Sequence, residues 1–123
     1  MLAFKLGGKA TLPPPPEVKP QVLAPPAATA SAATVKRGEA LYQGYCGQCH
    51  GDSAVSGGVL PDLRYSGALV DEQWFKIVRE GMLQQYGMVS FGTEITKPDA
   101  AAIRAYVIFR ANQSRTEKST NNK

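Results

Sequence analysis

The reactive groups of this chain are concentrated in one short stretch. Cys46 and Cys49 are separated by two residues, and His50 directly follows the second cysteine. Cys-x-x-Cys-His is the spacing by which two thiols bind a haem covalently while the histidine reaches its iron. Two intervening residues on a helical turn would place both sulfur atoms at the two vinyl groups. We therefore interpret Cys46, Cys49 and His50 as the attachment site of one haem c.

Three other roles of a Cys-x-x-Cys pair account for these residues less well. A thioredoxin-like dithiol would need a βαβ context, and the chain has no such pattern. A zinc site needs four ligands, whereas the sequence contains only 2 cysteines and 1 histidine. A structural disulfide between Cys46 and Cys49 would leave His50 unexplained.

The second axial ligand of the iron must be a residue other than histidine, because His50 is the only histidine. A methionine thioether is the usual partner, and it raises the reduction potential. Met88 is our preferred candidate, because it lies between the glycines of residues 87–92 and has Phe91 nearby to shield the haem edge. Met82 stays as the alternative, and whichever methionine does not bind iron would pack in the core.

Three helices are expected to position these groups. The sequence predicts them over residues 35–45, 72–80 and 100–112. Thr34 would cap the first helix, Val70 or Asp71 would open the second, and Gly81 would end the second.

The third helix is the best marked. Thr96, with Asp99 three residues later, forms a capping-box-like start, and no helix breaker follows before Asn112. Its mostly apolar face contains Ile103, Tyr106, Val107 and Arg110. We expect the polar residues 113–123 to be disordered. The pattern as a whole predicts a small all-α domain over residues 34–112, whose glycine-rich loops carry the chemistry.

The chain before this domain has a different composition. Residues 12–33 are rich in proline and alanine and include four consecutive prolines, which adopt an extended polyproline II rod. We interpret them as a linker, since a ligand for an SH3-type domain would need a partner that the sequence does not reveal. Residues 1–11 contain a short apparent strand that cannot bury itself alone. We take residues 1–11 as the severed end of an upstream domain, with a disordered leader as the alternative.

Charge and hydropathy narrow the function further. The net charge is +4, but the charges balance over residues 35–112 and no basic stripe with interleaved aromatics occurs, so we expect no nucleic-acid partner. No apolar run approaches the ~18 residues of a membrane span. The N-terminus does not resemble a signal peptide, although haem attachment normally follows export. We therefore expect a periplasmic protein whose signal has been removed, or a fragment of a longer chain.

Residues 38–112 resemble a class I cytochrome c. Gly38 and Tyr42 match positions of that family's N-terminal helix, and Ile103 and Tyr106 match its C-terminal helix. The resemblance implies that these two helices cross closely around one haem. Only Gly38 lacks a side chain at the crossing point, so it would permit the approach.

The same resemblance implies roles for three further residues. Pro61 is similar to the proline whose carbonyl accepts a hydrogen bond from the ligand histidine, here His50, although a simple turn proline is the alternative. Arg64 would pair with a haem propionate, with a solvated surface arginine as the alternative. Trp74 would reach a propionate through its indole N–H, or serve only as core.

A closer resemblance is to the C-terminal cytochrome domain of soluble (type II) quinohaemoprotein alcohol dehydrogenases. It rests on residues 57–66, 87–91 and 103–107, together with the upstream strand and proline-rich linker. In that family a propeller domain holding pyrroloquinoline quinone (PQQ) precedes the linker. The resemblance implies that a PQQ dehydrogenase domain donates electrons to the haem. A small copper protein or another cytochrome would accept them.

The expected function is thus single-electron transfer by a His/Met haem c. The catalytic propeller is missing, so this chain should not oxidise alcohols by itself. One alternative is a free-standing, diffusible periplasmic cytochrome c. A second alternative is a haem enzyme or gas sensor with an open sixth site, but such chemistry favours polar groups over the iron, and no second histidine is available.

Overall fold

The structure, a computed structural model, describes residues 7–9, 14 and 24–121. These residues contain helices and loops and no strand, so the predicted all-α class is confirmed. The predicted strand before Gly7 and half of the proline-rich segment (residues 12–13 and 15–23) lie outside the described residues. The α-helices are α1 (Ala32–Tyr45), α2 (Gly47–His50), α3 (Gln73–Val78) and α4 (Lys97–Asn121). The 3₁₀ turns are η1 (Asp52–Ala54), η2 (Leu63–Tyr65), η3 (Gly67–Val70) and η4 (Gln84–Tyr86).

Helix α1 begins earlier than predicted. Ser31 is its cap, and its hydroxyl accepts a hydrogen bond from the backbone N–H of Thr34 at 3.2 Å. Thr34, the predicted cap, therefore lies inside the first turn. The reason is that the two alanines between these residues are strong helix formers and extend the helix back to the nearest serine. The predicted end at Tyr45 is confirmed.

Helix α3 is shorter than the predicted range of residues 72–80. The Asp71 carboxylate accepts a hydrogen bond from the N–H of Gln73 at 2.8 Å, as expected for an opening residue. Regular helix ends at Val78, and Gly81 then takes a left-handed φ of 73°. The chain therefore leaves the helix at the predicted glycine, after a looser last turn.

Helix α4 begins at the predicted capping residues but continues well beyond Asn112. The Thr96 hydroxyl accepts a hydrogen bond from the N–H of Asp99 at 3.3 Å. The prediction of a disordered tail is wrong as far as Asn121, because the helix continues to that residue.

Contacts with η2 explain this extension of α4. Ser114 is buried and accepts a hydrogen bond from the guanidinium of Arg64 at 2.8 Å. One turn further on, the Lys118 ammonium donates to the Tyr65 hydroxyl at 2.8 Å and lies over its ring. These partners are about fifty residues away in sequence, so the local pattern of residues 113–123 could not reveal them.

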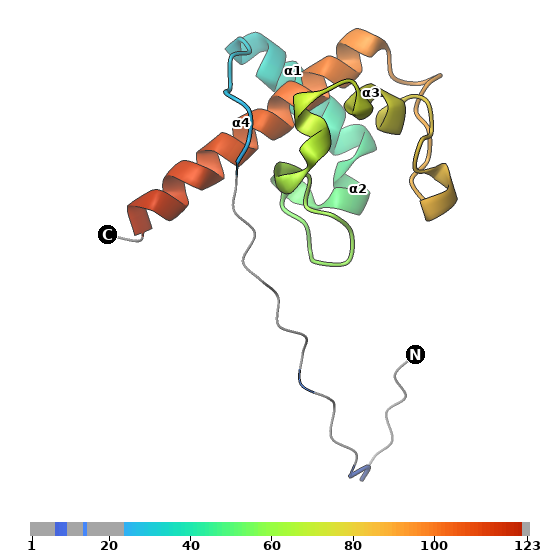
Figure 1. The fold of residues 1–123 in the computed structure, drawn as a ribbon, viewed down its shortest axis with the longest axis vertical. Helices are drawn as coiled ribbons and strands as arrows, with labels where there is room; N and C mark the ends of the chain where they lie inside the picture. The colour runs from blue at the N-terminus through green and yellow to red at the C-terminus, as the bar shows by residue number, and fades with distance from the viewer. Residues whose placement is uncertain (1–6, 10–13, 15–23, 122–123) are drawn as a thin grey trace.

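Helices α1 and α4 cross and form the centre of the domain (Figure 1). Gly38 lies at the crossing, where an added Cβ atom would overlap the carbonyl oxygen of Ala102. The rings of Tyr42 and Tyr106 pack at a centroid distance of 5.4 Å beside it. The predicted crossing of the N- and C-terminal helices is therefore confirmed, together with the glycine that permits it.

The core lies beneath this crossing. Its largest fully buried side chains are Tyr42, Ile95, Ile103, Tyr106 and Val107. Helix α3 packs on the same core and adds Trp74, Phe75 and Val78. In the described part of the chain, no helix combines the length and the apolar character that crossing a membrane requires.

The segment before α1 lies against the domain at one defined point. The side-chain amide of Asn112 on α4 donates a hydrogen bond to the carbonyl of Pro26 at 2.8 Å. Figure 1 shows this segment, in blue, passing beside α4 before α1 begins. The chain therefore contacts the domain before the predicted boundary between residues 33 and 34.

Candidate functional site

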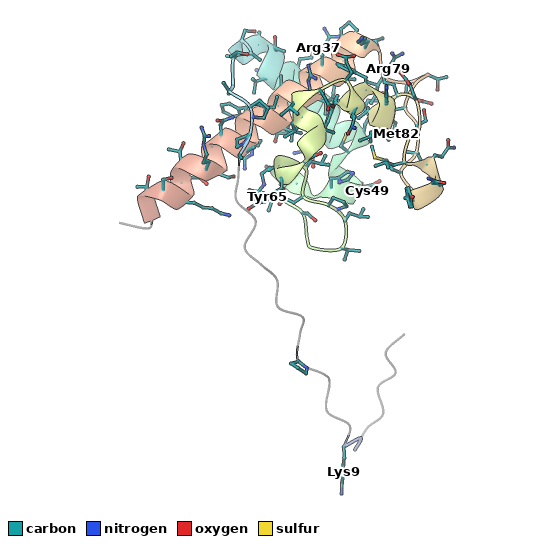
Figure 2. All side chains as sticks on the ribbon, in the orientation of Figure 1. Lys9, Arg37, Cys49, Tyr65, Arg79 and Met82 are labelled. Carbon is teal, nitrogen blue, oxygen red and sulfur yellow. The ribbon has the colours of Figure 1, made fainter. Side chains whose placement is uncertain are left out.

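The Cys-x-x-Cys-His motif forms one helical turn directly after α1. The N–H of Cys46 donates to the carbonyl of Tyr42 at 2.8 Å, and the N–H of His50 donates to the carbonyl of Cys46 at 2.9 Å. Cys49 is exposed on α2 (Figure 2), whereas Cys46 is buried, and both thiols are free. The fold thus presents the two sulfur atoms and the imidazole from one turn of backbone.

Burial and, to a smaller extent, the neighbouring Cys49 raise the pKa of the Cys46 thiol to about 11. At neutral pH the haem-free chain therefore carries Cys46 as a protonated thiol. Among the residues that the structure describes, no three His, Cys, Asp or Glu side chains gather as metal ligands. The donor set does not suit a zinc site.

The imidazole of His50 has a defined orientation. Its Nδ1 atom lies 3.0 Å from the carbonyl oxygen of Pro61. A carbonyl can only accept, so Nδ1 must carry the proton in this hydrogen bond. The lone pair then lies on Nε2, the nitrogen left for a metal ion.

The loop that follows α2 is held by both crossing helices. The Tyr42 hydroxyl donates to the carbonyl of Gly51 at 2.8 Å, and Arg110 Nε donates to the carbonyl of Ser53 at 3.0 Å. Ser53 and Ala54 adopt left-handed φ angles of 54° and 62°, which are unusual for residues with a Cβ atom. Sequence reasoning placed Arg110 on a helix face but missed this role, which has no local signal.

Arg64 binds groups of the protein itself. Its guanidinium donates to both carboxylate oxygens of Asp62, at 3.0 and 2.7 Å, and to the hydroxyl of Ser114 at 2.8 Å. The side chain of Arg64 is only 13 % exposed. Three of its five N–H groups are thus engaged, and they connect the loop to α4. A propionate contact from the remaining two stays a prediction.

Trp74 is a core residue that connects α3 to α4. The side chain is 3 % exposed, and the indole N–H donates to the carbonyl of Ala100 at 2.8 Å. An indole has a single donor, so the predicted contact from Trp74 to a propionate is incompatible with this conformation. The core alternative fits the structure.

The loop that follows α3 returns to the motif through Phe91. The Phe91 ring meets the Tyr45 ring edge-on at a centroid distance of 5.8 Å, and Tyr45 directly precedes the first motif cysteine. Met88 and Phe91 both pack on the hydrophobic core. Met82, which Figure 2 labels just beyond α3, is 51 % exposed. The two methionines thus have different environments.

The residues present fit a haem. Large exposed apolar side chains occur on the loops after α2 and α3, namely Val55, Val59, Leu60, Met82, Tyr86 and Val89. Exposed apolar side chains on the loops next to the motif are compatible with a large apolar ligand. The helix crossing, the motif turn and the oriented imidazole together define a c-type cytochrome domain.

Comparison with known families agrees with this class. The family described as cytochrome c oxidase, cbb3-type, subunit III matches residues 33–107, and the chain belongs to this family of cytochrome c domains. Covalently bound haem c is the cofactor of such domains, and it is the cofactor of this chain.

Several relatives are quinone-dependent alcohol dehydrogenases. The dehydrogenase subunit of an alcohol dehydrogenase (quinone) from Gluconobacter oxydans is 44 % identical over 115 residues, covering 93 % of this chain and 15 % of that protein. The quinohemoprotein alcohol dehydrogenase ADH-IIG from Pseudomonas putida is 40 % identical over 120 residues, covering 98 % of this chain and 16 % of that protein.

A solved structure of the Pseudomonas putida HK5 enzyme ADHIIG superimposes with a TM-score of 0.77 and 41 % identity. The match covers 94 % of this chain and 17 % of that one. The chain therefore spans about a sixth of the length of the dehydrogenases that it matches.

Proposed function

We propose that this domain is a single-electron relay in which haem c is attached through Cys46 and Cys49 and ligated by His50 and Met88. When bound, haem c supplies an iron that alternates between Fe(III) and Fe(II). The observation that carries the proposal is the motif turn, on which His50 presents Nε2 while Pro61 holds Nδ1.

Pro61 is proposed to orient the ligand. The hydrogen bond from His50 Nδ1 fixes the tautomer and limits rotation of the ring, so less reorganisation accompanies a change of charge at the metal. A backbone carbonyl has no proton to lose, and the contact therefore has the same form over a wide range of pH. Electron transfer benefits from a ligand geometry that does not change.

Met88 is proposed as the sixth ligand in preference to Met82. Met88 is partly buried and, like Phe91, packs on the core. Met82 is 51 % exposed. A thioether that must exclude water from the iron needs a packed environment. Phe91, held by Tyr45, is proposed to cover the haem edge.

The donor is proposed to be a PQQ-containing dehydrogenase domain upstream in a longer protein. The support is the set of relatives named quinone-dependent or quinohemoprotein alcohol dehydrogenases, which this chain matches over 89 to 98 % of its length. Residues 12–33 would tether the haem domain to that donor and keep it at high effective concentration. The acceptor would be a small copper protein or another cytochrome, and the compartment the periplasm. The alcohol chemistry would belong to the upstream domain.

A free-standing, diffusible cytochrome c is the second candidate. Cytochrome c550 from Pseudomonas aeruginosa is 40 % identical over 81 residues, covering 59 % of this chain and 53 % of that protein. The coding sequence upstream separates the two candidates, since a propeller domain supports the tethered relay and a signal peptide directly before this chain contradicts it.

Paired methionine variants test the ligation. We expect Met88→Ala to abolish the weak long-wavelength absorption band of Met–Fe(III) ligation, to lower the reduction potential and to let the ferrous protein bind CO. Met82→Ala is the matched control and should leave all three properties unchanged. If Met82→Ala removes the band instead, the ligand assignment is wrong. CO binding by the unaltered protein would favour a haem enzyme or gas sensor with an open sixth site.

A further inference from the structure

The segment that carries Met88 needs support from elsewhere in the domain. Between Gly81 and Thr96 its only helical element is the single turn η4. The backbone N–H of Met88 bonds to the carbonyl of Leu83 at 3.3 Å, a contact within the same segment. A thioether on such a segment is held only as firmly as the segment is fastened to the rest of the domain.

Arg79, at the end of α3, is the residue to which much of this segment is fastened. Its guanidinium donates to the carbonyl of Ile95 at 2.9 Å through Nε and to that of Gly92 at 3.4 Å through Nη2. Its own carbonyl accepts a hydrogen bond from the hydroxyl of Ser90 at 2.6 Å. One residue thus holds the segment at three points after Met88.

The fit around Arg79 is close. A Cβ atom on Gly92 would lie 2.5 Å from the carbonyl oxygen of Arg79, so only glycine allows the segment to approach. Next to these contacts, the N–H of Phe91 donates to the carbonyl of Val78 at 2.9 Å. The segment is therefore aligned along the last turn of α3 by main-chain and side-chain bonds together.

The guanidinium forms no ion pair with an acidic side chain among the described residues, since the salt bridges found there involve other cations. Its positive charge is instead directed at two main-chain carbonyls, and hydrogen bonds from a charged donor are stronger than neutral ones. Two donors from one planar group also fix direction as well as distance. This arrangement fastens the segment to α3 more firmly than packing alone would.

We propose that Arg79 is the positioning residue that keeps Met88 at the haem iron and so keeps the sixth site closed to outside ligands. The inference rests on the proposed His50/Met88 ligation. Arg79 acts through the segment from Ser90 to Ile95 and does not itself touch the haem. Without its hydrogen bonds the segment separates from α3 more often, and the thioether is displaced more easily.

Imidazole binding to the ferric haem protein tests this proposal. Arg79→Met keeps the length of the side chain but removes every donor, and we expect it to bind imidazole at least about tenfold more tightly, as expected when charged hydrogen bonds are lost. The long-wavelength Met–Fe(III) band should weaken. Arg79→Lys keeps one donor group and the charge. Its affinity for imidazole should lie between those of Arg79→Met and the unaltered protein.

Lys76→Met is the matched control, because it removes the same charge from an exposed position of α3. It should bind imidazole like the unaltered protein. Arg79→Met binding imidazole no more tightly than Lys76→Met would overturn the proposal. If Arg79→Met does not fold with haem, Ser90→Ala removes only one of the three bonds and should shift imidazole affinity less, in the same direction. Unchanged affinity in that variant also counts against the proposal.

Met88→Ala distinguishes a failure of the proposed ligation from a failure of the positioning role of Arg79. If it leaves the band and the imidazole affinity unchanged, the proposed ligation fails and the role of Arg79 fails with it. If Met88→Ala abolishes the band while Arg79→Met resembles the Lys76 control, the ligation stands and only the positioning role is overturned.

Discussion

Asp62 stabilises the loop that brings Pro61 to His50. Its carboxylate accepts hydrogen bonds from the guanidinium and the N–H of Arg64, and from the N–H of Ser56 at 3.4 Å. Burial by itself would raise the pKa of Asp62, but the hydrogen bonds and charge of Arg64, together with Ser56, outweigh it and lower the pKa below its ordinary 3.8. The ionised form is therefore the one that the fold favours.

The lowered pKa gives a testable dependence of stability on pH. The unfolded chain takes up the proton at a higher pH than the folded one, so Asp62 stabilises the fold above about pH 4 and loses this effect as pH falls through the folded pKa. We expect Asp62→Asn to cost about 1–3 kcal/mol at pH 7, in proportion to the charged hydrogen bonds lost. Its stability should also fall less steeply below pH 4. Urea unfolding of the haem protein from pH 7 to pH 3 measures the stability at pH 7 and its decrease with acid. If the stability of Asp62→Asn falls with pH as steeply as that of the unaltered protein, Asp62 does not have the proposed effect.

The crossing of α1 and α4 is the element on which the site depends. These helices provide Tyr42 and Arg110, which hold the loop after α2, and α1 leads directly into the motif turn. Gly38 sets how closely the helices approach, since the carbonyl of Ala102 occupies the position that a side chain would need. The distance between the helices is therefore part of the geometry of the site.

We expect Gly38→Ala to destabilise the domain by roughly 3 kcal/mol or more, because the new methyl group meets main chain and the helices must separate. Gly44→Ala is the control on the same helix, where an added Cβ meets nothing within 4 Å. It should stabilise α1 by roughly 0.5–1 kcal/mol, the helix preference of alanine over glycine. Thermal unfolding of both variants checks the pair. Equal effects would mean that the crossing tolerates a side chain.

At the scale of the whole molecule, the chain before α1 is fastened to the haem domain. Asn112 bonds to Pro26, and the same amide also donates to the carbonyl of Ile108 within α4 at 2.9 Å. A tether that connects two redox domains would thus leave this domain from α4, at a fixed place and direction. The length available to reach a donor would then be counted from Pro26 and not from residue 33.

Replacing Asn112 by Leu should release this anchor without changing the haem site. We expect cleavage within residues 27–31 by an added protease that cuts after alanine to accelerate roughly five- to tenfold, as for the loss of one hydrogen bond. The absorption spectrum should stay the same. Gln113→Leu, an exposed neighbour on α4, serves as the control and should leave the rate of cleavage unchanged. An unchanged rate of cleavage in Asn112→Leu would contradict the anchoring role.

The sequence by itself determined the features that depend on near neighbours in the chain. The spacing of Cys46, Cys49 and His50 fixed the type of site, since attachment chemistry needs that spacing on one turn. Capping residues and glycines located three helices to within a few residues, apart from the continuation of α4. Through the resemblance to class I cytochromes c, Gly38 and Tyr42 also indicated how the first helix packs.

The tertiary structure decided which polar groups found partners far along the chain. Arg64 bonds to Ser114, and Trp74 bonds to Ala100, so neither contact could be anticipated from local sequence. The continuation of α4 and the hydrogen bonds from Arg79 to the segment that carries Met88 likewise depend on partners that are distant in the sequence. The physical reason is that a buried donor must be satisfied, but only packing determines which acceptor lies within reach.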